Sequence, residues 1–85
     1  KVASKFIIFQ TPEGEQAVIF PREYFFHDEM ASRFPNYEVQ SAGFVQIIEN
    51  GQVHCFGRSD SLNIDSRGED DDIVISRQII KRSDE

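Results

Sequence analysis

The dipeptide Asn50-Gly51 is the sequence feature that most constrains the fold of this chain. An Asn-Gly pair between two apolar runs favours a two-residue type I′ turn, because the twist of that turn matches the twist of paired strands. We therefore expect the chain from residue 38 to residue 57 to form a β-hairpin. A two-residue turn pairs Ile48 with Val53, and this register extends along both strands.

The register assigns each side chain to one face of the hairpin, because side chains alternate along a strand. One face carries Val45, Ile47, His54 and Phe56, and the other carries Phe44, Ile48, Val53 and Cys55. Neither face is clearly polar, so both are expected to be covered. The second cover could be loops, a helix of the same chain or another subunit. We expect self-association, most simply as a homodimer, with a candidate interface at Phe44, Ile48, Val53 and Phe56.

A first hairpin is predicted near the start of the chain. Two apolar segments, 5–10 and 16–20, have the composition of strands. They flank Thr11-Pro12-Glu13-Gly14, in which Pro fixes φ early in a turn and Gly permits a positive φ later. Residues 1–4 are given no structural role.

A first helix is predicted over residues 22–34. Pro21 suits the first turn of a helix, where its missing N–H has no partner to lose. Phe26, Met30 and Phe34 follow at intervals of four, which places them on one helical stripe.

A second helix is predicted over residues 70–81. Acids occupy 69–72 and bases come last, and this order complements the helix dipole. The β-branched run Ile73-Val74-Ile75 leaves a strand as the alternative. The predicted fold class is therefore α+β, with an antiparallel sheet of about four strands in two hairpins and two helices, in the order ββαββα. One domain covers residues 1–85.

Charge and composition exclude several classes of partner. Fifteen acidic and nine basic residues give a net charge of −6, and the bases are spread over many segments. Such a chain repels a phosphate backbone, so nucleic acid is not expected as a partner. The apolar runs are far shorter than the ~20 residues of a membrane span, so no membrane association is expected. A lone cysteine, Cys55, excludes an internal disulfide and suits a reducing cytoplasm.

Catalytic and metal-binding motifs are not recognised in the sequence. It contains no phosphate-binding loop, zinc signature or nucleophile motif, so no catalytic residue, metal or cofactor is assigned and an enzyme is not indicated. His54 and Cys55 are strand neighbours that point to opposite faces, so they cannot form a catalytic pair. His27 is predicted to lie on the surface of the first helix beside acidic residues.

The segment 57–67 is the densest polar cluster and the candidate ligand site. Guanidinium groups, hydroxyls and backbone N–H groups in such a loop can bind a phosphate or carboxylate. The candidate ligand-binding residues are Arg58, Ser59, Asp60, Ser61, Asn63 and Arg67. The alternative is a solvated connection held by Asx and Ser turns and Arg–Asp pairs, because Asp60 and Asp65 neutralise much of the positive field.

Parts of residues 38–72 resemble small bacteriophage and prophage proteins of unknown activity. The stretches that carry the resemblance are Ser41-Ala42-Gly43-Phe44-Val45, Cys55 to Asn63 and Asp65-Ser66-Arg67. The resemblance implies a phage-encoded protein in a bacterial cytoplasm and transfers no functional residue. We expect a non-enzymatic protein–protein interaction module that self-associates and binds a host or phage protein. The alternative is a protein that binds a small anionic ligand, such as a nucleotide or phosphate, through the 57–67 loop.

Overall fold

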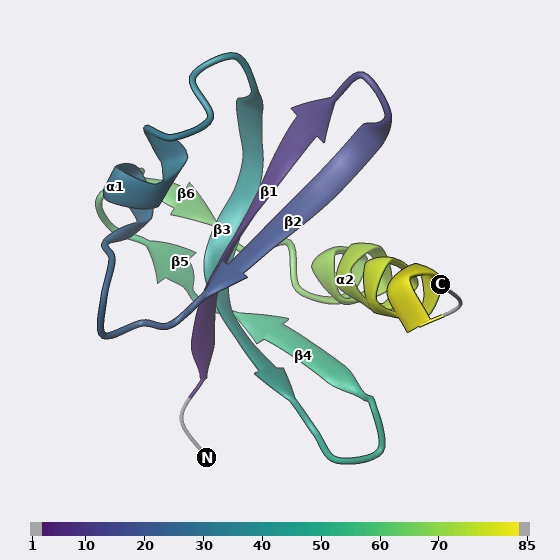
Figure 1. Ribbon diagram of the computed structural model, residues 1–85. Coiled ribbons are helices and arrows are strands. Elements are labelled where there is room, and N and C mark those ends of the chain that lie inside the picture. The colour runs from purple at the N-terminus through teal and green to yellow at the C-terminus, as the bar shows by residue number, and fades with distance from the viewer. Residues whose placement is uncertain (1–2, 84–85) are drawn as a thin grey trace.

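Four strands form one antiparallel sheet in the order β2-β1-β3-β4, and two short strands form a second sheet (Figure 1). The computed structural model describes residues 3–83, with side chains described through residue 80. Along the chain the elements are β1 (Ser4–Thr11), β2 (Gly14–Phe20), α1 (His27–Ala31), β3 (Glu38–Ile47), β4 (Val53–Phe56), β5 (Arg58–Ser59), β6 (Ile64–Asp65) and α2 (Glu69–Ser83). The predicted α+β class, with a four-stranded antiparallel sheet and two helices, is confirmed.

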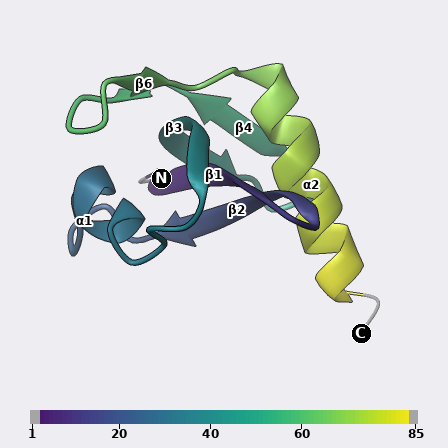
Figure 2. The ribbon, with the colours of Figure 1, turned by 90° about the horizontal axis from the view of Figure 1, so that it is seen from above.

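The strand β1 lies inside the sheet and is covered on both faces. Phe6 and Ile8 pack with Ile75 of α2 on one face. Ile7 and Phe9 pack on the other face against residues of α1 and of the β5–β6 hairpin. A continuous apolar run is the pattern of a strand buried on both sides, and Figure 2 shows α2 and α1 on opposite sides of the sheet. The core is therefore three layers deep and centred on β1.

The helix α2 reaches both outer strands of the sheet. Near its start, Asp72 Oδ1 accepts a hydrogen bond of 2.7 Å from the Cys55 N–H of β4. Farther along, the Gln78 side-chain amide donates to the Ala17 carbonyl and accepts from the Ala17 N–H, both at 2.8 Å, on β2. Figures 1 and 2 show α2 lying across the side of the sheet between these two strands.

The β3–β4 hairpin is present, but its predicted register is wrong by one residue. Ile48 N–H donates to the Gln52 carbonyl at 2.8 Å, which leaves a three-residue loop. Gly51 takes the positive φ, +88°, as in a type I turn followed by a Gly bulge. A type I′ turn also needs a positive φ at Asn50, and among the described non-glycine residues only Asn63 has one.

The shifted register changes which residues share a face of the hairpin. Val45 now pairs with Cys55, and Ile47 pairs with Val53, on the face toward α2. Phe44 pairs with Phe56 and Gln46 with His54, on the opposite face. The faces expected from the sequence are therefore wrong. Val45 and Cys55 are buried, whereas Phe56 is 38% exposed, so a helix of the same chain covers one face near its base.

The first helix is much shorter than predicted. It covers His27–Ala31, and Phe26 has extended backbone angles with its ring 66% exposed. Extended backbone lets Phe25 and His27, two residues apart, both turn toward the sheet, where Phe25 packs in the core and His27 is buried. Packing of these two side chains against the sheet therefore overrides the helical pattern of the sequence.

The remaining elements agree in part with the sequence. The second helix is confirmed and begins with its four acids. The segment 57–67, predicted as turn-like, contains the small β5–β6 hairpin. Residues 1–4 were given no structural role, but Ala3 is buried and Ser4 begins β1. Lys1 and Val2 lie outside the described residues.

Gly43 lies next to the last residue pair of the β3–β4 ladder, Phe44 and Phe56. A Cβ at this position would lie 2.5 Å from the Phe56 carbonyl oxygen. The close approach of the two backbones leaves no room for a side chain at this glycine. A bulge in β3 lies at Gln40, because Ile8 pairs with Ser41 and Phe9 pairs with Val39.

Candidate functional site

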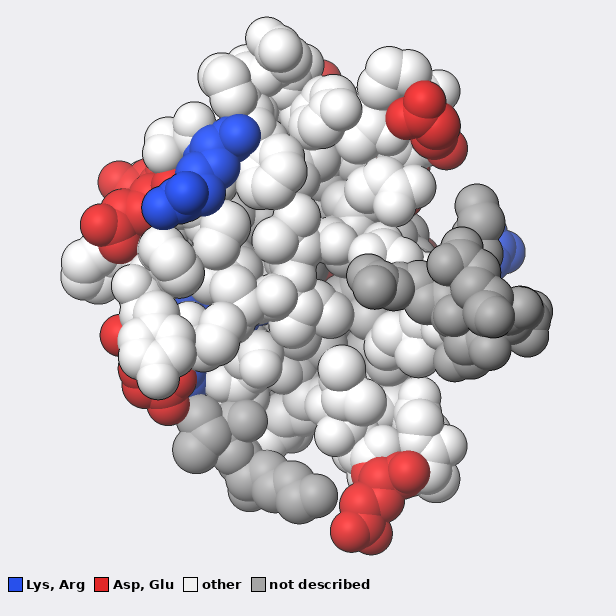
Figure 3. All heavy atoms as spheres, viewed as in Figure 1, with Lys and Arg blue, Asp and Glu red and all other residues white. Residues whose placement is uncertain are grey.

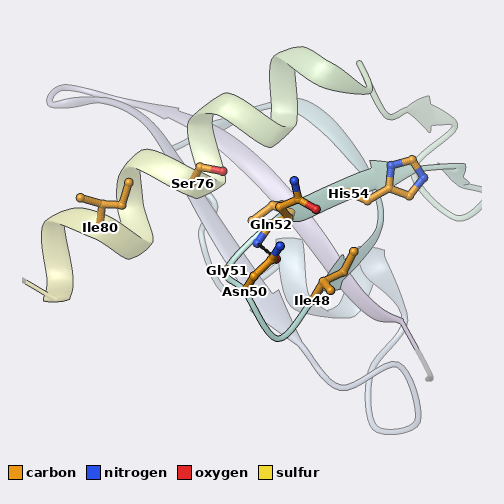
Figure 4. A pocket seen from close by; sticks show the side chains of 8 residues that line it. Ile48, Asn50, Gly51, Gln52, His54, Ser76 and Ile80 are labelled. Carbon is orange, nitrogen blue, oxygen red and sulfur yellow. Dashed lines mark hydrogen bonds between the residues drawn. The ribbon is translucent and has the colours of Figure 1, made fainter.

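A groove lies between the β3–β4 hairpin and the C-terminal half of α2 (Figure 4). We call it the hairpin groove; its volume is about 660 Å³. Its lining residues are Ile48, Asn50, Gly51, Gln52, Val53, His54, Ser76 and Ile80. None of these eight described residues is Asp, Glu, Lys or Arg. The groove is open and shallow in form, which suits contact with another protein surface better than enclosure of a small molecule.

The walls of the hairpin groove are formed by isoleucines from two elements. Ile80 of α2 is 62% exposed, and Ile48 of the hairpin is 48% exposed. Between them, Asn50 Oδ1 accepts a 3.0 Å hydrogen bond from the Gln52 N–H. This bond holds the turn that carries Ile48, because Asn side chains stabilise turns two residues on.

A second hollow of about 360 Å³ lies between β2 and α2. We call it the β2 crevice; it is lined by Ala17, Val18, Ile19, Ile75, Gln78 and Ile79. None of these described lining residues is charged either. Figure 3 shows that the face of the molecule seen in Figure 1 is largely uncharged, with acidic and basic side chains toward its rim. Both hollows adjoin the C-terminal half of α2.

The predicted interface residues do not form one surface. Ile48 and Val53 line the hairpin groove. Phe44 and Phe56 lie on the face of the hairpin away from Val53, with ring centroids 6.0 Å apart. The Phe56 ring also stacks on His54 at 5.4 Å. The structure therefore brings together only half of the predicted set at the groove, and adds Ile80, which the sequence analysis did not select.

The Arg58 side chain is held by oxygens of its own loop. Its Nε donates to Asp60 Oδ1 at 3.2 Å, and its Nη1 donates to Asp65 Oδ1 at 3.0 Å. Its Nη2 donates to Asn63 Oδ1. The structure brings these four residues together as the sequence suggested, but the guanidinium group faces carboxylates of the protein.

The serines of the 57–67 loop support its conformation. Ser59 is fully buried, and its Oγ accepts a 3.1 Å hydrogen bond from the Leu62 N–H. Ser61 Oγ accepts from the Asp28 N–H at 3.1 Å and so connects the loop to α1. These contacts are those of a connection stabilised by Ser turns.

Arg67 lies in a separate ionic network that is centred on the buried carboxylate of Asp71. Asp71 Oδ1 accepts from Ser41 Oγ at 2.7 Å and from Arg67 Nε at 2.9 Å. Its Oδ2 accepts from Ser66 Oγ at 2.9 Å and from the Arg67 N–H at 2.6 Å. The two Nη groups of Arg67 donate to the two carboxylate oxygens of Glu15 at 2.8 and 3.1 Å.

The network joins β2, β3 and the start of α2. The hydrogen bonds from Arg67 hold the pKa of Glu15 below its ordinary value, and the same carboxylate raises the pKa of Arg67. Asp71 is not among the predicted site residues, because it lies in a run of four acids that resembles a solvated helix start. Asp71 lies four residues before Ile75, on the buried stripe of α2. This spacing is the sequence signal that could have indicated its burial.

The histidines and the cysteine do not form a reactive pair. His27 was predicted on the surface, but it is 4% exposed and its Nε2–H donates to the Gly43 carbonyl at 2.9 Å. Burial holds the pKa of His27 below its ordinary value. Burial raises the pKa of the Cys55 thiol well above its usual range, so the reactive thiolate is not formed near neutral pH. As predicted, Cys55 and His54 point to opposite faces.

Neither the described residues nor comparisons with known proteins point to a family or a cofactor. Among the described side chains, no group of three His, Cys, Asp or Glu residues is placed to hold a metal ion. No helix among the described residues is long and apolar enough to cross a membrane. No protein-family model, curated protein or solved structure matches this chain.

Proposed function

We propose that this chain is a non-enzymatic protein-interaction module that self-associates through the hairpin groove. The observation that carries the proposal is the uncharged lining of the groove. Twenty-eight per cent of the chain is charged, yet none of the eight lining residues is Asp, Glu, Lys or Arg. Exposed isoleucines on both walls supply apolar surface that water solvates poorly.

The uncharged lining of the groove suits a second copy of this acidic chain. Two copies of net charge −6 repel each other wherever their acidic groups meet. The groove avoids that repulsion, and a two-fold arrangement uses the same apolar surface twice. Ile48 and Ile80 are 48% and 62% exposed. Covering each side chain contributes about 1 kcal/mol to the free energy of association, on the basis of ~25 cal/mol per Å² of apolar surface.

A host or phage protein is proposed as a further partner. This part of the proposal rests on the resemblance to phage and prophage proteins, because small phage proteins of this kind act by binding. The groove offers such a partner the same uncharged walls as it offers a second copy.

Replacing Ile80 with Glu is expected to weaken self-association at least tenfold, because the new carboxylate lies in the groove. Ile73→Glu is the matched control. Ile73 lies on the same helix, is 50% exposed and is not part of the groove lining, and its substitution adds the same charge. Sedimentation equilibrium over a range of concentrations measures both variants against the unaltered chain.

The comparison between Ile80→Glu and Ile73→Glu tests the proposal. A loss of association in Ile80→Glu alone supports the groove. A monomeric unaltered chain at high micromolar concentration, or an equal loss in both variants, contradicts it. Added salt is expected to strengthen the association of the unaltered chain, because screening reduces the repulsion between acidic copies.

The anion-binding alternative for the 57–67 loop gives a different expected result. An incoming phosphate would have to displace Asp60, Asn63 and Asp65 from the Arg58 guanidinium. We therefore expect inorganic phosphate and nucleotides to leave the melting temperature unchanged, both in the unaltered chain and in Arg58→Ala. A stabilising shift that Arg58→Ala abolishes would establish the alternative instead.

A further inference from the structure

The outer edge of β2 is closed by a side chain at one position. β2 is the first strand in the sheet order, so no strand of the described residues lies beside one of its edges. Gln78 donates to the Ala17 carbonyl and accepts from the Ala17 N–H, each at 2.8 Å. A residue of a neighbouring antiparallel strand makes the same two hydrogen bonds in a hydrogen-bonded pair. The Gln78 amide therefore occupies the place of an added strand.

The bonds at Ala17 also show which other groups point outward. Backbone direction alternates along a strand, so Glu15 and Ile19 direct their N–H and C=O groups toward the same edge as Ala17. These three residues supply the outward-pointing N–H and C=O groups of the β2 edge. The edge is at most seven residues long, which is the length of β2. Long edges are usually protected by lysine, proline or a covering element. β2 contains neither lysine nor proline, and α2 is its cover.

We propose that the β2 edge is a strand-addition site for β2 of a second copy, and that the C-terminal half of α2 is its detachable cover, fixed by Gln78. This inference goes beyond the hairpin groove and does not depend on it. A copy that releases the C-terminal half of α2 loses the Ile80 wall of that groove, so the two modes of association are alternatives.

The sequence of β2 suits pairing with itself. In an antiparallel pair centred on Ala17, Glu15 of one copy faces Ile19 of the second copy, and Gln16 faces Val18. No like charges meet in this register, and the only charged side chain of β2, Glu15, is already paired with Arg67. Ala17 at the centre leaves room for close approach. Strand addition requires the end of α2 to move off the β2 edge. Gln78 is the residue that bonds α2 to this edge.

The experiment replaces Gln78 with Ala, with Gln16→Ala as the matched control on β2. Association is measured by sedimentation equilibrium, and the exchange of the Glu15 and Ile19 amide hydrogens is measured by NMR. We expect Gln78→Ala to associate at least tenfold more tightly than the unaltered chain, with slower exchange at both amides. Gln16→Ala is expected to behave as the unaltered chain. Association through the hairpin groove leaves these two amides open to water, so the exchange readout separates the two proposals.

Two further variants keep the test decisive. Ile19→Pro removes an outward N–H that makes no bond within the sheet, so adding it to Gln78→Ala is expected to abolish the new association. If Gln78→Ala does not fold, Gln78→Glu replaces it, since a carboxylate cannot donate to the Ala17 carbonyl. A folded Gln78 variant that associates no more tightly, or that does so while Glu15 and Ile19 exchange at the unaltered rate, overturns the proposal.

Discussion

Asp71→Ala is expected to lower the free energy of unfolding by about 3–5 kcal/mol, the range for breaking a buried ion pair by removing one partner. Asp71 is fully buried and accepts four hydrogen bonds from Ser41, Ser66 and Arg67. Removing it takes away the partner of the fully buried Ser41 hydroxyl, and Arg67 loses the bonds of its Nε and its backbone N–H. Urea denaturation followed by circular dichroism measures the change.

The neighbouring acid provides the matched control for this prediction. Asp70 is exposed and belongs to the same first turn of α2. Asp70→Ala is therefore expected to cost less than about 1 kcal/mol, the upper range for a favourable charge near a helix start. Equal effects of the two substitutions would mean that Asp71 acts only through the helix dipole, which contradicts the network described above.

Gly43→Ala is expected to lower the free energy of unfolding by about 1–3 kcal/mol, as for overpacking of a well-packed interior. The added Cβ would lie 2.5 Å from the Phe56 carbonyl oxygen and 3.2 Å from Ser66 Cβ, so the β4 backbone must shift. Faster amide exchange in β4 is expected to accompany the loss. Thermal unfolding and hydrogen exchange measure the two effects.

Gly51→Ala is the control that distinguishes the effect of crowding at Gly43 from the effect of backbone strain at a glycine. A Cβ at Gly51 meets nothing within 4 Å, but the residue has a φ of +88°. Its substitution is therefore expected to cost about 1 kcal/mol through strain alone and to leave amide exchange in β4 unchanged. A larger cost at Gly51 than at Gly43 would show that the close approach at Gly43 is not a tight contact.

Local patterns in the sequence predicted most of the elements. The run from Phe6 to Phe9 indicated a strand, and its burial on both faces follows from the absence of polar residues. The turn between Thr11 and Gly14 and the helix after residue 69 also depend on local signals, and both are present. These predictions succeeded because local chemistry alone determines the backbone there.

The errors arose where packing between distant segments determines the local backbone conformation. A two-residue and a three-residue turn are both compatible with Asn50-Gly51, and only the burial of Val45 and Cys55 under α2 selects the second. The helix predicted over 22–34 placed Phe26 on its buried stripe, but Phe26 is exposed. Phe25 and His27 bury against the sheet instead, from extended backbone. No pattern within either segment carries that information.

The candidate site was the least predictable part of the molecule. The groove joins the hairpin around Ile48 to Ile80, which lie 32 positions apart in the sequence. The polar composition of the 57–67 loop predicted a ligand site, yet its Arg58 and Ser59 bond to atoms of the same loop. Composition identifies residues capable of binding, and the fold decides whether their bonding capacity is already used.

A dilution series of the unaltered chain, followed by NMR, tests self-association through the hairpin groove most directly. We predict that the amide signals of Gln52, Val53 and Ser76 move together as concentration rises, with one dissociation constant, while those of α1 and of the β5–β6 hairpin stay in place. Signals that do not move up to millimolar concentration, or that move at α1 or β5–β6 and not at the groove, would contradict the account.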